Sequence, residues 1–310
     1  MRATGQAQRA LRAARPFFSS KSAAGVLPLT TSSLPLSPSP APTLSQSTPS
    51  KPRLHSTFPA SSSSVNATEL SHFSSLASSW WDPHGPSRPL HQMNPLRHDF
   101  IRLCLGPSYP SPSSGPTLRY LDVGCGGGIF AESAARLPTT REVTAIDPSE
   151  TILEVARQHM RGDPGLKGKL RYLNRSIETL EVPGDKDKYD VVSLFEVLEH
   201  VDHPKEFLRR LSQFVRPDGG WLVMSTIART WISWIVTNVV AEDILGVVPK
   251  GTHDWNKYVN VEELRELFKS EGGWSEPRVM GVVYVPGCGW KVVEGSEKIG
   301  NYFFGVQRLD

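Results

Sequence analysis

A glycine-rich segment that directly follows an apolar run constrains the fold of this chain more than any other feature. Residues 118–123 form an apolar run typical of a buried strand, and the segment after the glycines, IFAESAARL, is typical of a helix. Between them stand Gly124, Gly126, Gly127 and Gly128. In α/β folds, a strand, a glycine turn and a helix start bring backbone N–H groups close to a ligand. The alternative is a tight turn that needs glycine only for positive φ angles.

A second strand-like run ends in a carboxylate. Asp147 closes the run VTAI, which follows the expected helix after Gly128. At such a strand end, a carboxylate can accept hydrogen bonds from both hydroxyls of a ribose. The spacing of the glycines differs from the dinucleotide pattern G-x-G-x-x-G, because Ile129 stands where that pattern needs glycine. Since a tight turn alone leaves Asp147 unexplained, the two segments together predict a site for a nucleoside cofactor.

Residues 1–68 differ in composition from the rest of the chain. They contain no Asp or Glu, seven of the 34 basic residues, and long Ser, Pro and Thr stretches. An Arg-rich, Ser-rich and acid-free leader is typical of an organelle transit peptide, and a disordered basic tail is the alternative. We expect residues 1–65 to be this leader and residues 66–310 to be the working domain. The chain beyond residue 68 has 27 basic and 31 acidic residues, a net charge of −4, so charge gives no support for nucleic-acid binding. Three cysteines without paired spacing favour a reducing compartment.

Strands and helices are expected to alternate after residue 117. This alternation predicts an α/β fold with a parallel sheet and helices on both faces. A helix is expected over Glu69–Ser79, and a second one from the cap pair Asn94-Pro95 to Leu105. The C-terminal strands are expected to pair as a hairpin. The expected strands are 118–123, 142–146, 169–173, 189–194, 220–225, 277–285 and 302–309, and the expected later helices are 129–137, 149–160 and 204–215.

Three potential metal ligands follow another buried strand. Glu196, Glu199 and His200 come just past the run that ends at Leu194. If a helical turn starts there, these positions share one face, and two carboxylates with one imidazole suit a divalent cation. The alternative is a solvated first helical turn, where acidic residues are favoured by the helix dipole. The carboxyl ends of strands are where open α/β sheets bind ligands, which favours the metal site.

Four motifs extend these patterns to a specific family. The segments WWDPHGPSRPLHQMNPLRHDFI, LDVGCGGGIFAES, FEVLEHV and VPKGTHDWNKYV together resemble the ubiquinone-biosynthesis O-methyltransferases, over roughly residues 66–310. The resemblance implies the Rossmann-like fold of class I methyltransferases that use S-adenosylmethionine, a seven-stranded, mostly parallel sheet with an antiparallel last strand. It implies cofactor contacts from Arg97 to the methionine carboxylate, from the Gly124 backbone, from Asp147 to the ribose and from Phe195.

The resemblance also implies the chemistry of the site. Glu196, Glu199 and His200 would hold Mg²⁺ or another divalent cation, which lowers the pKa of a catechol hydroxyl. His200 or His253 would serve as the base, and the residues do not decide between them. Two departures stand out: the loop 106–117 is longer than we expect for the family, and the residue type at position 195 varies.

The substrates implied by the resemblance carry a long polyprenyl tail. They are a polyprenyl dihydroxybenzoate and a later demethylubiquinol. Residues 229–250 include Trp231 and Trp234, but acidic residues interrupt the apolar run, so it is too short to span a bilayer. An interfacial helix is expected there, with an ordinary lid helix as the alternative. These features predict peripheral association with the matrix side of the mitochondrial inner membrane, and the resemblance implies a multi-subunit ubiquinone-biosynthesis complex.

Two other classes of function compete with this prediction. A nicotinamide-dependent oxidoreductase would need glycine at position 129 and a catalytic Tyr-x-x-x-Lys or similar motif, and the chain has neither. A catalytically silent methyltransferase-like scaffold is the other alternative. The intact glycine segment, Asp147 and the EVLEH motif argue against it.

Overall fold

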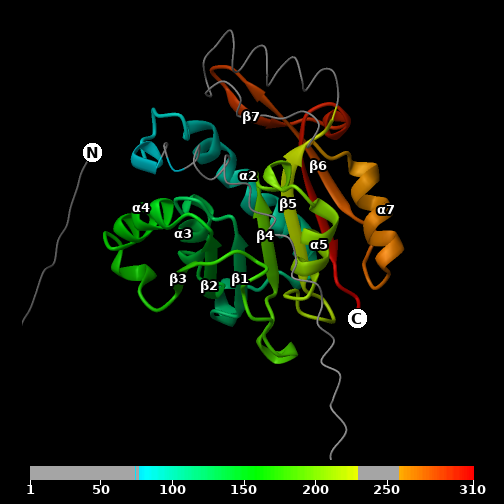
Figure 1. Ribbon diagram of the computed structural model, residues 1–310, viewed down its shortest axis with the longest axis horizontal. Helices are drawn as coiled ribbons and strands as arrows, with labels where there is room; N and C mark the ends of the chain where they lie inside the picture. Colours follow the sequence, from blue (N-terminus) through cyan, green and yellow to red (C-terminus); the bar gives the residue numbers. More distant parts are fainter. Residues whose placement is uncertain (1–73, 75–76, 230–257) are drawn as a thin grey trace, which may run out of the picture. The chain divides into compact units, whose positions relative to one another are not determined.

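The fold is built on one sheet whose first five strands run parallel (Figure 1). The computed structural model describes residue 74, residues 77–229 and residues 258–310. Within them, eight strands pair in the order β3-β2-β1-β4-β5-β8-β6-β7, one strand more than the resemblance implies. The strands are β1 Leu118–Val123, β2 Thr140–Asp147, β3 Leu170–Asn174, β4 Val191–Phe195, β5 Trp221–Ile227, β6 Arg278–Val285, β7 Gly289–Val292 and β8 Asn301–Gln307.

Apolar residues alternate across the sheet and create two separate cores. Tyr120 packs into the core of one face with Phe100 and Phe130, while the next residue, Leu121, packs into the other core with Phe207. Leu121 is fully buried, and burying such a side chain contributes roughly 1.5–3 kcal/mol. Helices therefore cover both faces of the sheet, as the sequence predicts. The helices are α2 Arg88–Leu105, α3 Ile129–Ala135, α4 Glu150–Met160, α5 Pro204–Ser212 and α7 Val261–Glu271.

The order of the strands fixes where a ligand can bind. The chain runs outward from β1 to β2 and β3, then returns to place β4 on the other side of β1. The carboxyl ends of β1 and β4 therefore flank the point where the strand order reverses, and open α/β sheets bind ligands there. The glycine segment follows β1, and Glu196 follows β4 directly.

The start of α2 differs from the prediction. The helix begins at Arg88 after Ser87, and a proline stands at one of its first two positions, so Asn94 is not its cap and Pro95 lies inside it. A proline suits a helix start because its nitrogen has no hydrogen to leave unpaired. The expected helix over 69–79 lies mostly outside the described residues, and its last three, Ala77–Ser79, form the short 3₁₀ helix η1.

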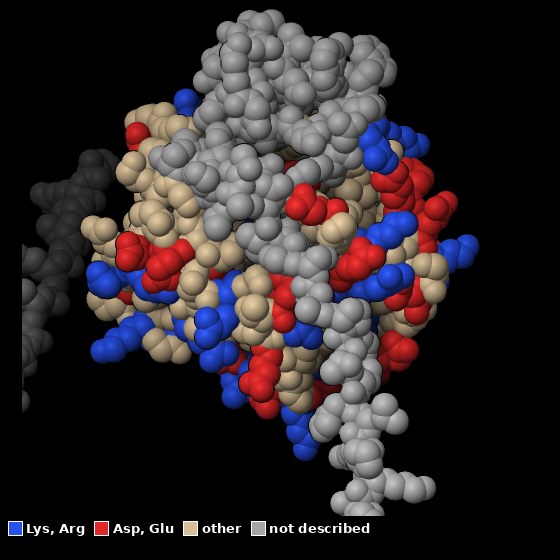
Figure 2. Space-filling model, viewed as in Figure 1, with Lys and Arg blue, Asp and Glu red and all other residues tan. Residues whose placement is uncertain are grey.

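The C-terminal part holds two elements that the sequence analysis did not predict. Strand β8 lies between β5 and β6 and runs antiparallel to both, which confirms the predicted pairing of the last two strands. The tight hairpin, however, joins β6 to the unpredicted β7. Helix α7 was also missed, although Asn260 and Glu263 form a capping box at its start. On the face shown in Figure 2, basic and acidic side chains are interspersed over the described surface.

Candidate active site

The glycine segment forms a tight loop whose conformation only glycine adopts readily. Gly124, Gly126 and Gly128 have φ angles of 67°, 53° and 88°. The N–H groups of Gly124 and Cys125 donate to the carbonyl of Ile146 at 2.9 and 3.1 Å, which ties the loop to the end of β2. The loop therefore lies at the predicted place, after β1 and beside the second strand end.

Space, as well as φ, excludes larger residues from this loop. A Cβ atom on Gly124 would lie 2.5 Å from Cγ2 of Val197, and one on Gly128 would lie 2.0 Å from the hydroxyl of Tyr172. Both contacts are closer than real Cβ atoms tolerate. The loop thus packs tightly between Val197, after β4, and Tyr172 of β3. Its glycines are therefore needed for this close packing as well as for the turn.

Asp147 connects the glycine loop to the start of α4. Its Oδ2 accepts a hydrogen bond from Gly126 N at 3.0 Å, and its Oδ1 accepts one from Ser149 N at 2.8 Å. Burial raises the pKa of Asp147, and these two backbone hydrogen bonds oppose the shift. An ionised carboxylate has about four acceptor positions, so both oxygens can still accept hydrogen bonds from ribose hydroxyls.

Arg97 brings a buried guanidinium from α2 to the same edge of the sheet. Its side chain is 4% exposed, its Nε has no hydrogen-bond partner, and its Cζ lies 5.1 Å from the centre of the Phe195 ring. Burial lowers the pKa of Arg97, while the negative charges of Glu196 and Asp122 raise it. An unpartnered buried donor is costly, and an anionic ligand group would satisfy it.

Helix α2 is fastened to α3 on either side of Arg97. Asn94 Nδ2 donates to Ser133 Oγ at 2.9 Å, and His98 Nε2 lies 2.8 Å from the same hydroxyl. Burial and the charges of Arg102 and Arg97 lower the pKa of His98 to about 4, so its ring is neutral at pH 7. The sequence predicted Asn94 as a cap, whereas the structure uses its amide to position the helix that carries Arg97.

A second buried carboxylate lies beneath the loop. Asp122, in β1, accepts a hydrogen bond from Ser193 Oγ of β4 at 2.7 Å. Burial raises the pKa of Asp122 to about 7, and the Ser193 hydrogen bond and the positive charge of Arg97 oppose that rise. The side chain of Cys125 is also buried, which raises its thiol pKa and fits a small turn residue rather than a nucleophile.

The turn after β4 has a different shape from the predicted helical turn. Glu196 has a φ angle of 57°, and its N–H lies 3.2 Å from both Ser225 O and Ser225 Oγ of β5. Only Leu198–His200 forms a 3₁₀ helix, η6. The expectation that Glu196 shares a helical face with Glu199 is therefore wrong, because the backbone of Glu196 is left-handed and the 3₁₀ helix begins only at Leu198.

Two carboxylates in this turn nevertheless lie close enough to influence each other. Glu199 is 4% exposed, and its Oε2 accepts a hydrogen bond from Thr226 Oγ1 at 2.9 Å. Burial, followed by the negative charge of Glu196, raises the pKa of Glu199 to about 7, while His200 opposes the rise. Oε1 of Glu196 is buried without a partner. This arrangement favours a bound proton or cation between the two acids.

The described part of the chain contains no group of three or more His, Cys, Asp or Glu side chains that could hold a metal ion. Glu196, Glu199 and His200 all lie within that part, so the structure does not arrange them as a three-ligand group, and the set stays a prediction. His253, the other candidate base, lies outside the described residues. So does the proposed interfacial segment, apart from Arg229.

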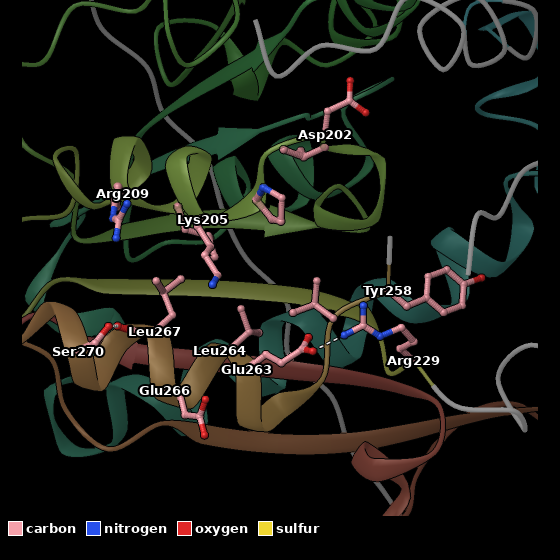
Figure 3. A pocket seen from close by; sticks show the side chains of 14 residues that line it. Asp202, Lys205, Arg209, Arg229, Tyr258, Glu263, Leu264, Glu266, Leu267 and Ser270 are labelled. Atoms are coloured by element: carbon pink, nitrogen blue, oxygen red, sulfur yellow. Dashed lines mark hydrogen bonds and ion pairs between the residues drawn. The ribbon is translucent and has the colours of Figure 1, made fainter. Parts of the chain in front are cut away.

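A groove of about 630 Å³ lies between α5 and α7, next to this turn. Figure 3 shows Lys205 and Arg209 on one side, Glu263 and Glu266 on the other, and the ion pair between Arg229 and Glu263. The groove begins at Val201, one residue past η6, but no residue of the glycine loop lines it. The groove is therefore separate from the glycine loop.

Sequence analysis missed the side chains that cover the glycine loop. In the sequence analysis, the Trp80-Trp81 pair is only part of a family motif. In the structure, Trp80 lies against Gly126 and Gly127, and Trp81 Nε1 donates to Gly127 O at 2.9 Å. No local pattern signals these contacts, because 46 residues separate the two partners of that hydrogen bond.

Comparison with known proteins agrees with this arrangement. The family model of the methyltransferase domain matches residues 90–272. The chain is 39% identical over 290 residues to the mitochondrial ubiquinone biosynthesis O-methyltransferase of Candida albicans, covering 79% of this chain and 86% of that protein. It is 41% identical over 256 residues to the Schizosaccharomyces pombe protein of the same name, covering 79% and 87%. The ubiquinone biosynthesis O-methyltransferase of a Methylobacterium species is 38% identical over 252 residues, covering 79% and 96%.

Proposed function

The chain belongs to the family of ubiquinone biosynthesis O-methyltransferases, and we propose that it transfers the methyl group of S-adenosylmethionine to a catechol oxygen of a polyprenylated substrate. The proposal rests on one observation: Asp147 accepts a hydrogen bond from Gly126 of the glycine loop, at the edge of the sheet where the strand order reverses. That place and that carboxylate suit the nucleoside half of the cofactor.

The cofactor contacts follow from the charges of the site. Asp147 accepts hydrogen bonds from the ribose hydroxyls, and the Gly124 backbone approaches the cofactor closely. Arg97, with its unpartnered Nε, pairs with the methionine carboxylate. Phe195 lies beside this group, because the Cζ atom of Arg97 is 5.1 Å from the centre of its ring. Holding donor and acceptor at a near-attack distance of about 3–3.5 Å can supply much of the rate of an in-line displacement.

The acceptor side requires the removal of a proton. Catechol hydroxyls are mostly protonated at neutral pH, so the attacking oxygen must be made nucleophilic. A divalent cation such as Mg²⁺, when bound, would lower the pKa of that hydroxyl. The half-buried Glu196 and the buried Glu199 fit two of its ligand positions, because Oε1 of Glu196 has no partner and the pKa of Glu199 is raised. His200 completes the proposed set, and His253 then accepts the proton, because an imidazole that binds the cation has no lone pair left for it. His200 is the alternative base where it does not bind the cation.

The proposed substrates are a polyprenyl dihydroxybenzoate and a later demethylubiquinol. A long tail keeps both at a membrane, and residues 229–250, with Trp231 and Trp234, are the proposed interfacial segment. None of the helices in the described residues is long and apolar enough to cross a membrane. Replacing both tryptophans by serine should reduce binding to liposomes but spare a short-tailed soluble catechol. Unchanged liposome binding would contradict the proposed role of this segment.

The proposed location is the matrix side of the mitochondrial inner membrane, within a multi-subunit complex of the same pathway. The acid-free composition of residues 1–68 supports this location, and relatives named as mitochondrial support the organelle. A fluorescent reporter fused behind residues 1–68 should enter mitochondria. A reporter that stays in the cytosol would contradict the proposed targeting role of residues 1–68.

One experiment tests the proposed reaction. The full chain is incubated with methyl-labelled S-adenosylmethionine, Mg²⁺ and a dihydroxybenzoate with a short prenyl tail, and cofactor binding is measured in parallel by calorimetry. We expect binding and a labelled methoxy product. Cofactor binding without product would indicate a silent scaffold, and binding of a nicotinamide nucleotide instead would indicate an oxidoreductase. Either result would overturn the proposal.

A further inference from the structure

The Trp80-Trp81 pair lies directly on the glycine loop. A Cβ atom on Gly126 would be 2.4 Å from Cζ2 of Trp80, and one on Gly127 would be 2.1 Å from its Cδ1. Two neighbouring glycines therefore meet the same indole ring. Trp80 also packs with Ile129 of α3 and Ile152 of α4, so its ring is held between the loop and the starts of these two helices.

Trp81 has a fixed position of its own. Its ring stacks on His159 of α4 with ring centroids 3.5 Å apart and an interplanar angle of 2°. His159 Nδ1 in turn lies 2.9 Å from an oxygen of Glu132, which is fully buried and also accepts from Arg136 Nη2 at 2.7 Å. The stack holds the indole so that its Nε1–H reaches the carbonyl of Gly127. A hydrogen bond of this kind stabilises the loop conformation.

The segment that carries the two tryptophans is fastened at both ends. His91 Nε2 of α2 lies 2.9 Å from the carbonyl oxygen of Trp80. Ser74 Oγ lies 2.9 Å from Ser149 Oγ, at the N-terminus of α4 and two residues past Asp147. The segment thus runs from the predicted ribose side of the loop to the helix that carries Arg97, and it crosses the loop between them.

One atom in this segment lacks a partner. Trp80 is 8% exposed, and its Nε1 is buried without a hydrogen bond. Leaving a buried donor unsatisfied is unfavourable, because it loses its hydrogen bond to water without gaining another. The atom lies against Gly127, within the loop that forms the proposed cofactor cradle. An oxygen of a bound cofactor would remove this cost.

We propose that Trp80 and Trp81 are positioning residues for the cofactor. Trp81 fixes the carbonyl of Gly127 and so the direction of the loop's N–H groups. The ring of Trp80 covers Gly126 and Gly127, and its Nε1–H donates to an oxygen of the cofactor. The inference rests on the proposed function, because it needs S-adenosylmethionine as the ligand of this loop.

Conservative variants test the inference. Trp81→Phe keeps an aromatic ring to stack on His159 but removes the N–H, and Trp80→Phe keeps a ring over the two glycines but removes the donor. Each should raise the KM for S-adenosylmethionine by about 3–10-fold, the equivalent of one hydrogen bond, while kcat and melting temperature stay near wild type. Trp274→Phe is the matched control, because Trp274 packs on Phe268 of α7 at the other core. It should leave the KM unchanged.

A second readout separates positioning from general packing. Cofactor binding should change tryptophan fluorescence in the wild type and in Trp274→Phe, and less in the two test variants. An unchanged KM in folded Trp80→Phe and Trp81→Phe would overturn the inference. So would a loss of folding in both, because the pair would then be ordinary core. Absence of cofactor binding by the wild type would instead overturn the proposed function itself.

Discussion

The two halves of the site differ in how their charged groups are paired. The cofactor half is the glycine loop with Asp147 and Arg97, and the acceptor half is the turn with Glu196 and Glu199. In the cofactor half, Asp147 accepts hydrogen bonds from two backbone N–H groups. In the acceptor half, Glu199 has the hydroxyl of Thr226 and a negatively charged neighbour, while an oxygen of Glu196 has no partner. In the cofactor half the carboxylate of Asp147 is thus paired by the chain itself, and the groups without partners, Arg97 Nε and Trp80 Nε1, are donors. In the acceptor half the group without a partner is a carboxylate oxygen beside a second carboxylate, which a cation would pair. Changes in the two halves should thus have separable effects.

The largest expected effect comes from the acceptor half. Glu199→Ala should lower the rate of methyl transfer by roughly a thousandfold, since a Lewis acid supplies several kcal/mol to such a reaction. Binding of S-adenosylmethionine, measured by calorimetry, should not change. Glu206→Ala, which removes an exposed acid in the first turn of α5, is the control and should keep full activity. Weakened cofactor binding by Glu199→Ala would show that the halves are not independent.

The next effect belongs to the cofactor half. Asp147→Ala should weaken cofactor binding by about 1.5–3 kcal/mol, or roughly 10–150-fold in Kd, because a charged acceptor is lost. Asp147→Asn keeps one acceptor oxygen and should lose less. Melting curves check that the loop, which Asp147 also ties to α4, remains folded. A Kd equal to that of the wild type would place the ribose elsewhere.

A smaller effect is expected from the contact between α2 and α3. Asn94→Ala and Ser133→Ala each remove the hydrogen bond that holds the helix of Arg97, and each should raise the KM for S-adenosylmethionine by up to about tenfold. Ser133→Ala also removes the contact of this hydroxyl with His98, so the double variant should be little worse than Ser133→Ala alone. A fall in kcat without a change in KM would contradict the assignment of this contact to the cofactor half.

The smallest effect is on the pH dependence of stability. The pKa of Glu199 is raised to about 7 from an ordinary value of 4.5, so the folded chain binds more protons than the unfolded chain between those pH values. Stability from this group is therefore complete below about pH 4.5 and is lost as pH rises towards 7. Asp122 acts in the same direction.

Glu199→Gln should flatten only part of this decline, as measured by the melting temperature without added metal from pH 5 to pH 7.5. Two superimposable curves would mean that the pKa of Glu199 is not raised in the folded chain.

The same comparison explains what the sequence could predict. Strand β1, the glycine loop, α3 and Asp147 depend on patterns within a few residues, and these elements match the prediction. The turn at Glu196 was mispredicted because its N–H bonds to Ser225, which is 29 residues away and is not part of a local pattern. Trp80 and Trp81 likewise meet their partners only after the chain has folded. Helix α7 is the exception, since its capping box was visible in the sequence but not read.

The central claim is that the cofactor half works without the acceptor half, and one measurement tests it most directly. Calorimetric binding of S-adenosylmethionine and methyl transfer to a short-tailed catechol are measured on the same full-length protein, first in a chelator and then after Mg²⁺ is restored. Our interpretation predicts unchanged cofactor affinity throughout, no transfer in the chelator, and recovery with Mg²⁺. Full transfer in the chelator, or cofactor binding that disappears with the metal, would contradict it.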